Sequence, residues 1–248
     1  MGKVTHLKCN GKRKSNNFID NRSISLPFSA KAVILHTVMD KNIKNIIFDL
    51  GGVLVGLNPE RCINAFREIG CGVLASYVEE HRTEDLFLET ELGRIDEGEF
   101  CNEVRRIAHT DTPDKDIVWA WNQLLTGIPH EKLLRLARLK QQGYRLFLLS
   151  NTNSMHWNRC RDYFFTACGL HATDYFEHIF LSYEMHLAKP DMEIFNEALA
   201  IAGINAAETI FIDDSEANCE AAAKEGLKTY LSKGGGDWLE LFGNAQKQ

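Results

Sequence analysis

Polar residues stand at the ends of four short apolar segments and are candidates for a shared reaction. Asp49 follows residues 43–48, Ser150-Asn151 follows 144–149, Lys189-Pro190 comes shortly after 178–181, and Asp213-Asp214 follows 209–212. Any one of these groups alone would be assigned to a turn or to the start of a helix. Four such groups, all polar and all placed where an apolar segment ends, predict one functional site.

These residue types are the ones that metal-assisted attack by a carboxylate on phosphorus requires. We predict that Asp49 is the catalytic nucleophile and that its second oxygen binds Mg²⁺, a cation that prefers oxygen ligands. Asp213 and Asp214 would add further anionic ligands to this metal. A hydroxyl, an amide and an ammonium can hold phosphoryl oxygens, so the predicted substrate-binding residues are Ser150, Asn151 and Lys189. The predicted partner is a small phosphorylated metabolite.

The elements that position these residues alternate between helix and strand. Three amphipathic helices each end at a glycine before an apolar strand: 133–142 before 144–149, 192–202 before 209–212, and 217–225 before 227–231. Glycine suits the left-handed conformation in which many helices end. The alternation predicts an α/β fold with a Rossmann-like parallel sheet, which binds ligands beyond the carboxyl ends of its strands.

The interval between the first two motifs indicates an inserted domain. Asp49 and Ser150 are 101 residues apart, far more than one helix and one strand occupy. Helical patterns recur through this interval, at 60–69, 77–92, 97–108 and 114–125, so we expect about four inserted helices. The predicted organisation is a core of residues 43–57 and 128–248 and a helical cap of residues 58–127 that covers the strand ends.

The motifs resemble those of the haloacid dehalogenase (HAD)-like hydrolase superfamily, in its branch with a helical cap between the first two motifs. The matching segments are 46–54 (IIFDLGGVL), 148–151 (LLSN), Lys189-Pro190 and 210–214 (IFIDD). Segments 150–153 and 213–218 are similar to the branch that contains bacterial α-D-glucose-1-phosphate phosphatase. The resemblance implies an aspartyl-phosphate on Asp49, phosphate binding by Ser150 and Lys189, and Mg²⁺ held by Asp49, the Gly51 carbonyl, Asp213 and Asp214.

Gly51 departs from the pattern of most phosphatases in this superfamily. They carry a second Asp two residues after the nucleophile, as general acid and base, a function typically worth about 10² to 10⁴ in rate. Glycine offers only its backbone at this position. We therefore expect a substrate with a good leaving group, such as an anomeric or acyl phosphate. His156 has a suitable pKa for proton transfer, but we expect it to be a structural residue.

Composition and charge exclude several classes of protein. The net charge of −6 lacks the basic excess of nucleic-acid-binding proteins. No apolar segment approaches the roughly 20 residues of a membrane helix. The seven cysteines include no C-x-x-C pair, which favours a reducing compartment, so we expect a cytoplasmic protein without bound zinc. Residues 1–42 are expected to be a weakly ordered leader, with natural translation starting at Met39.

Two alternatives compete with the phosphatase interpretation. A metal-free haloacid dehalogenase would use the same Asp49, but two further carboxylates, Asp213 and Asp214, would only repel its anionic substrate. A non-catalytic sensor of a phosphorylated ligand would explain Gly51, although it has no need of a nucleophile. No motif in the expected cap specifies the substrate, and none indicates the oligomeric state.

Overall fold

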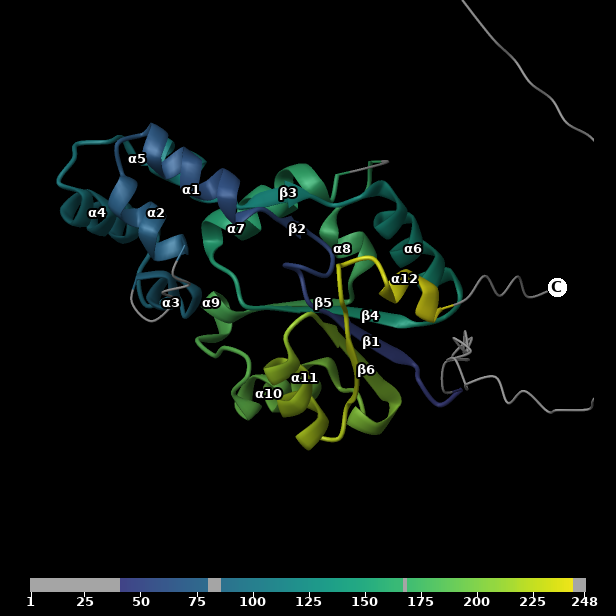
Figure 1. Cartoon of the computed structure of the whole chain (residues 1–248). Helices are drawn as coiled ribbons and strands as arrows, with labels where there is room; N and C mark the ends of the chain where they lie inside the picture. Colours follow the sequence, from purple (N-terminus) through teal and green to yellow (C-terminus); the bar gives the residue numbers. More distant parts are fainter. Residues whose placement is uncertain (1–40, 80–85, 167–168, 243–248) are drawn as a thin grey trace, which may run out of the picture. The chain divides into compact units, whose positions relative to one another are not determined.

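The computed structural model describes residues 41–79, 86–166 and 169–242 (Figure 1). The predictions about a leader and about Met39 therefore lie outside the described residues, except for positions 41 and 42. None of the helices in the described ranges combines the length and the apolar character that crossing a membrane requires.

A five-stranded parallel sheet forms the centre of the described structure. Its order is β5 (His178–Leu181), β4 (Arg145–Ser150), β1 (Asn45–Phe48), β6 (Thr209–Asp213) and β7 (Lys228–Leu231). β1 lies in the middle, where Ile46 is opposite Leu146 on one side and Ile210 on the other. The parallel sheet confirms the predicted Rossmann-like α/β fold, and its central position explains why β1 is apolar on both faces.

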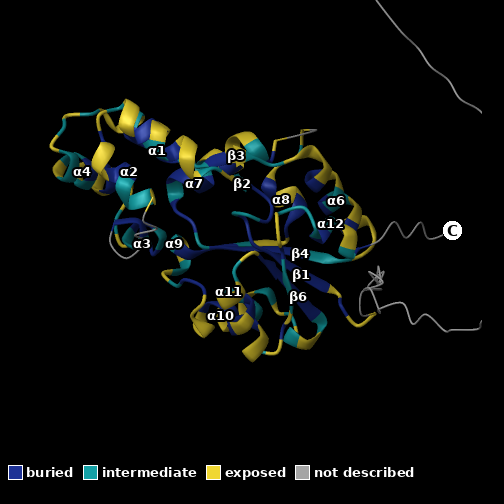
Figure 2. Ribbon diagram, viewed as in Figure 1, coloured by how far each residue is buried: buried dark blue, intermediate teal, exposed yellow. Residues whose placement is uncertain are grey.

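Helices cover both faces of this sheet. Ile47 of β1 faces a cluster with α10 (Met192–Ala202) and α11 (Glu216–Lys224), while Ile46 and Phe48 face α6 (His130–Gln141) and Trp238 of α12 (Trp238–Leu241). Shorter elements complete the connections: α7 (Ser154–Arg159), a π-helix (Cys160–Phe164), α8 (Ala172–Tyr175), α9 (Ser182–Met185) and a 3₁₀ turn (Ala206–Glu208). Figure 2 shows the central strands β4, β1 and β6 as mostly buried and the outer helix surfaces as exposed.

Five helices of the described ranges, which we call the helical insert, follow β1. They are α1 (Pro59–Glu68), α2 (Gly72–Glu79), α3 (Leu86–Glu91), α4 (Glu97–Ala108) and α5 (Asp114–Asn122), and they lie between β2 (Gly56–Leu57) and β3 (Leu125–Gly127). The insert has its own core, in which Phe66, Phe87 and Phe100 surround Trp121. Local signals start its helices: the Asn58 side chain caps α1, and Asp96 and Glu99 form a capping box at α4.

The insert differs in two details from the sequence-based expectation. A helix was predicted over 77–92, and the structure has α2 begin earlier, at Gly72, and α3 end at Glu91, while residues 80–85 of the predicted helix lie outside the described residues. The last predicted helix ends earlier, at Asn122, because residues 125–127 form β3 and pair antiparallel with β2. This two-stranded ribbon was not predicted, since its strands are short and lie far apart in the sequence.

The insert contacts the core at the carboxyl ends of the parallel strands. Helix α5 packs against α7, which follows β4, and α3 packs against α9, which follows β5. Figure 1 shows α1–α5 grouped beyond that end of the sheet. The helical insert therefore lies next to the positions where the sequence places its polar motifs.

Candidate active site

Parallel pairing brings Asp49 and Asp213 together at the centre of the sheet. The Asp49 N–H donates a hydrogen bond to the Ile212 carbonyl (2.9 Å), which continues the β1–β6 ladder by one residue. Ser150 occupies the corresponding end of β4 on the other side of β1. All three side chains are buried. The sheet thus assembles residues that are separated by up to 164 positions, as the motif positions predicted.

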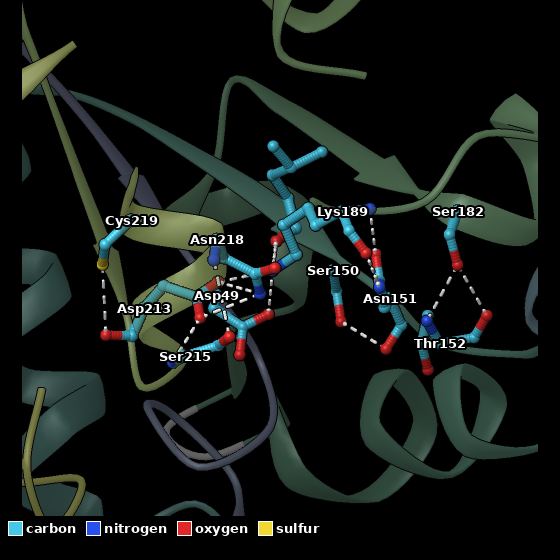
Figure 3. Close-up of polar contacts among 11 residues, drawn as sticks. Asp49, Ser150, Asn151, Thr152, Ser182, Lys189, Asp213, Ser215, Asn218 and Cys219 are labelled. Atoms are coloured by element: carbon cyan, nitrogen blue, oxygen red, sulfur yellow. Dashed lines mark hydrogen bonds and ion pairs between the residues drawn. The ribbon is translucent and has the colours of Figure 1, made fainter. Parts of the chain in front are cut away.

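Lys189 joins the two carboxylates (Figure 3). Its Nζ lies 2.7 Å from Asp49 Oδ1, 2.7 Å from Asp213 Oδ2 and 3.0 Å from the Leu149 carbonyl oxygen. The Lys189 side chain is only 1% exposed. Burial would lower the pKa of Lys189, but the attraction of Asp49 and Asp213 outweighs burial and raises that pKa. Lys189 is therefore a permanent positive charge beside the predicted nucleophile.

The Asn151 side chain holds the backbone of Lys189. Asn151 Nδ2 donates to the Lys189 carbonyl (2.9 Å), and Asn151 Oδ1 accepts from the Lys189 N–H (2.9 Å). Both polar atoms of the amide thus take part in positioning Lys189, and the contact of Asn151 with substrate stays a prediction, since Nδ2 carries a second N–H. The Ser150 hydroxyl makes one long hydrogen bond among the described residues, 3.3 Å to the Asn151 carbonyl, which leaves it able to bind an oxygen of a ligand.

Three carboxylates form a group that fits a divalent cation. Oxygens of Asp49, Asp213 and Asp214 lie within 4.8 Å of one another. Asp213 is held by the Ser215 N–H (2.8 Å) and by Asn218 Nδ2, while Asp214 is exposed and can turn toward a metal. Three carboxylates and one Lys189 ammonium leave an excess negative charge, which Mg²⁺ would balance. All the donor atoms are oxygens, the ligands that Mg²⁺ prefers. The residues present therefore fit the predicted metal.

Gly52 allows Asp214 to approach this group. Its φ is +72°, and a Cβ at this position would lie 2.0 Å from Asp214 Oδ2. Any side chain at position 52 would displace that carboxylate. Gly51 differs, because a Cβ there would make only an ordinary contact of 3.4 Å with Leu57 Cδ1. Gly52 and Asn218 thus position Asp214 and Asp213, a role that their places within the motifs did not reveal.

The environment of Asp49 is balanced between opposing charges. Burial raises the pKa of Asp49, the Lys189 ammonium lowers it, and Asp213 raises it again, with a net pKa of about 7. Burial, with the negative charge of Asp213, also raises the pKa of Asp214. A cation bound among these carboxylates would favour their ionised forms, which a nucleophile and metal ligands require.

Two other features bear on the site. His156 is buried, stacks on Trp121 (4.6 Å between ring centroids) and places Nε2 3.2 Å from the Trp121 carbonyl oxygen, so it joins the insert to the core, as expected of a structural histidine. A cavity of about 770 Å³ adjoins Asp214 and Gly52 and is also lined by Lys132 and Gly235. This cavity provides space beside the carboxylate group.

The chain belongs to the haloacid dehalogenase-like hydrolase family, whose model matches residues 43–226. It is similar to the D-ribitol-5-phosphate phosphatase of Bacteroides thetaiotaomicron, with 28% identity over 200 residues that cover 80% of this chain and 96% of the relative. A sesquiterpene phosphatase of Aspergillus oryzae is 27% identical over 187 residues, covering 74% of this chain and 87% of the relative. The predictions of a HAD family member and of an enzyme are confirmed.

Solved structures support the same assignment. A HAD family enzyme from Bacteroides thetaiotaomicron, in complex with magnesium and inorganic phosphate, matches with a TM-score of 0.77 and 44% identity over 81% of this chain and 99% of that chain. A HAD-like hydrolase from Porphyromonas gingivalis matches with a TM-score of 0.74 and 35% identity, covering 83% and 98%. Magnesium, the metal predicted from the sequence, is thus bound in a related structure. An L-2-haloacid dehalogenase with 19% identity and a TM-score of 0.54 shares the fold alone.

Proposed function

We propose that the protein is a Mg²⁺-dependent phosphatase of a small phosphorylated metabolite, with a sugar phosphate or the phosphate of a related polyol favoured. The observation that carries this proposal is the buried cluster in which Lys189 contacts both Asp49 and Asp213. The names of the relatives support it, since two are phosphatases and one of them acts on ribitol 5-phosphate. The related structure with magnesium and inorganic phosphate supports the metal and the ligand class.

In the proposed reaction, a carboxylate oxygen of Asp49 attacks phosphorus and the bond from phosphorus to the leaving-group oxygen breaks. Water then hydrolyses the aspartyl-phosphate and regenerates Asp49. Lys189 and the Ser150 hydroxyl hold phosphoryl oxygens in line with the attacking carboxylate. Mg²⁺, held by Asp49, the Gly51 carbonyl, Asp213 and Asp214, would neutralise the repulsion between the carboxylates and the substrate.

The helical insert is proposed to act as the cap, over residues 58–127. Its contacts with α7 and α9 place it beside the carboxyl ends of the strands, where it can exclude water and select the leaving group. Exclusion of water matters because charges interact more strongly when they are removed from bulk solvent. We also propose a cytoplasmic location, because the described cysteines Cys62, Cys71, Cys101, Cys160 and Cys219 are all free.

The test is phosphate release from a panel of phosphorylated metabolites, with and without Mg²⁺, by wild type and by the Asp49→Asn variant. Asn keeps the shape of Asp but cannot form the aspartyl-phosphate, so we expect release only from wild type with Mg²⁺ present. Exposed Asp162 provides a matched control, and Asp162→Asn should retain wild-type activity. Folded wild type that releases no phosphate from any compound would favour a non-catalytic sensor, and chloride release without Mg²⁺ would favour a dehalogenase.

A further inference from the structure

Gly51 leaves the leaving group without a proton donor beside the nucleophile. An alkyl phosphate, such as ribitol 5-phosphate, releases a strongly basic alkoxide unless its oxygen is protonated as the bond to phosphorus breaks. A proton acceptor is needed again when water attacks the aspartyl-phosphate. Either the substrate has a good leaving group, or another residue of the chain supplies this function.

Glu91, the last residue of α3, is held by its backbone next to the proposed phosphate-binding residues. The Ser182 hydroxyl donates to the Glu91 carbonyl (2.6 Å) and accepts from the Thr152 N–H (2.9 Å), and Thr152 is two residues beyond Ser150. Figure 3 shows Ser182 and Thr152 bonded to each other beside Asn151. A single hydroxyl group therefore connects the end of α3 to the loop after β4.

The residues that follow Glu91 are also fixed to the core. The Leu92 carbonyl oxygen lies 2.9 Å from His186 Nδ1. Gly93, with φ of +64°, packs so closely that a Cβ would lie 2.1 Å from the Tyr183 carbonyl oxygen. Three successive residues of the insert thus contact α9 or the residue after it, and this anchoring limits where the Glu91 side chain can go.

The Glu91 side chain carries a carboxyl group for which the described residues provide no partner. Among the described residues it makes no hydrogen bond and no ion pair, although the residue is half-buried. Burial raises the pKa of Glu91 to about 7, and the positive charge of Lys189 partly opposes this rise. The ammonium that contacts Asp49 is therefore also the charge that acts on the Glu91 carboxyl group.

Several described polar and charged groups on α3 and α9 have partners of their own. Glu89 on the same helix bonds Arg94 (2.8 Å). On α9, the Tyr183 hydroxyl donates to Glu184 (3.0 Å), and His186 contacts the Leu92 carbonyl. Of these groups, Glu91 alone combines a half-buried position, the influence of the Lys189 charge and a carboxyl group without a described partner. Its backbone anchors it beside the loop after β4, where the leaving group would lie.

We propose that Glu91 is the general acid and base that replaces the side chain missing at Gly51. Its carboxyl group gives a proton to the leaving-group oxygen as the bond from phosphorus to that oxygen breaks and the bond to Asp49 forms. Its carboxylate then takes a proton from the water that attacks the aspartyl-phosphate, so that phosphate leaves and both carboxyl groups return to their starting states. This inference rests on the phosphatase function proposed above.

The test compares substrates that differ in their need for a proton. Glu91→Gln keeps the size and polarity of the side chain but cannot transfer a proton. For ribitol 5-phosphate we expect kcat/KM to fall about 10²-fold or more. For p-nitrophenyl phosphate, whose leaving group needs no proton, kcat/KM should stay close to wild type. With this substrate the variant should also show a burst of p-nitrophenol, because hydrolysis of the aspartyl-phosphate still lacks its base.

Glu89→Gln is the matched control, since Glu89 lies on the same helix and pairs with Arg94, and it should behave as wild type with both substrates. An equal fall of kcat/KM for both substrates in Glu91→Gln would overturn the proposal and assign Glu91 to binding or folding. Unchanged values for both would also overturn it. If wild type releases phosphate from no compound of the panel, or if Asp49→Asn matches wild type, the phosphatase function itself fails, whatever Glu91 does. If wild type hydrolyses other compounds of the panel but not ribitol 5-phosphate, its best alkyl phosphate replaces ribitol 5-phosphate in the comparison.

Discussion

The junction between the helical insert and the core is expected to weaken at acidic pH because of His156. This side chain is 6% exposed and lies between the Trp121 ring, on which it stacks, and the Trp121 carbonyl. Burial lowers the pKa of His156 from 6.5 to about 4, although the hydrogen bond to the Trp121 carbonyl opposes this effect. In the unfolded chain the histidine regains its ordinary pKa, so protonation favours unfolding.

The size of the effect follows from the two pKa values. The stabilisation from neutral His156 is fully present above about pH 6.5 and is lost as the pH falls toward 4. Between the two pKa values, each pH unit changes the free energy of unfolding by about 1.4 kcal/mol. The loss of stability is therefore about 2 kcal/mol at pH 5 and about 3 kcal/mol below pH 4. Other titrating groups add their own pH dependence, so the contribution must be measured as a difference between variants.

The assay is urea unfolding at pH 7.5 and pH 5.0 for wild type, His156→Gln and His130→Gln. His130 is exposed at the start of α6 and serves as the control. His156→Gln should be less stable than wild type at pH 7.5, but its free energy of unfolding should fall about 2 kcal/mol less on acidification. His130→Gln should follow wild type. Equal losses in wild type and His156→Gln would refute the reasoning.

Three further substitutions test the geometry of the site. Lys189→Met should lower the free energy of unfolding by about 3 to 5 kcal/mol in urea titrations, since two buried carboxylates lose their partner; a loss below about 1 kcal/mol would contradict this. Gly52→Ala displaces Asp214, so the Mg²⁺ concentration for half-maximal phosphatase activity should rise about 10-fold or more, and an unchanged value would argue against Asp214 as a ligand. Gly51→Asp needs only an ordinary contact with Leu57, so this variant should fold. The double variant Gly51→Asp/Glu91→Gln should have a kcat/KM on ribitol 5-phosphate at least about tenfold higher than that of Glu91→Gln alone. Failure to fold would contradict the space inferred at position 51.

Local patterns were sufficient to predict the strands and the residues at their ends. The five strands of the sheet agree with the apolar segments to within two residues, because a strand buried on both faces must be apolar along its length. The predicted nucleophile and the aspartate pair follow from the same logic, since each stands where an apolar segment stops, whereas Lys189 lies eight residues beyond the end of β5. The ribbon of β2 and β3 was missed because its stability depends on a partner that lies outside the local sequence.

Other roles of side chains in the site become visible only in the tertiary structure. The sequence predicts Asn151 as a substrate ligand, and the structure adds that its amide binds the Lys189 backbone 38 residues away. Glu91 looks like an ordinary charged residue at the end of a helix, and only its backbone contact with Ser182 and the charge of Lys189 mark it as a candidate for proton transfer. The physical reason is that a side chain's chemistry depends on burial and on neighbouring charges. Motifs at strand ends carry a local signal, whereas those surroundings arise only when the insert and the sheet pack together.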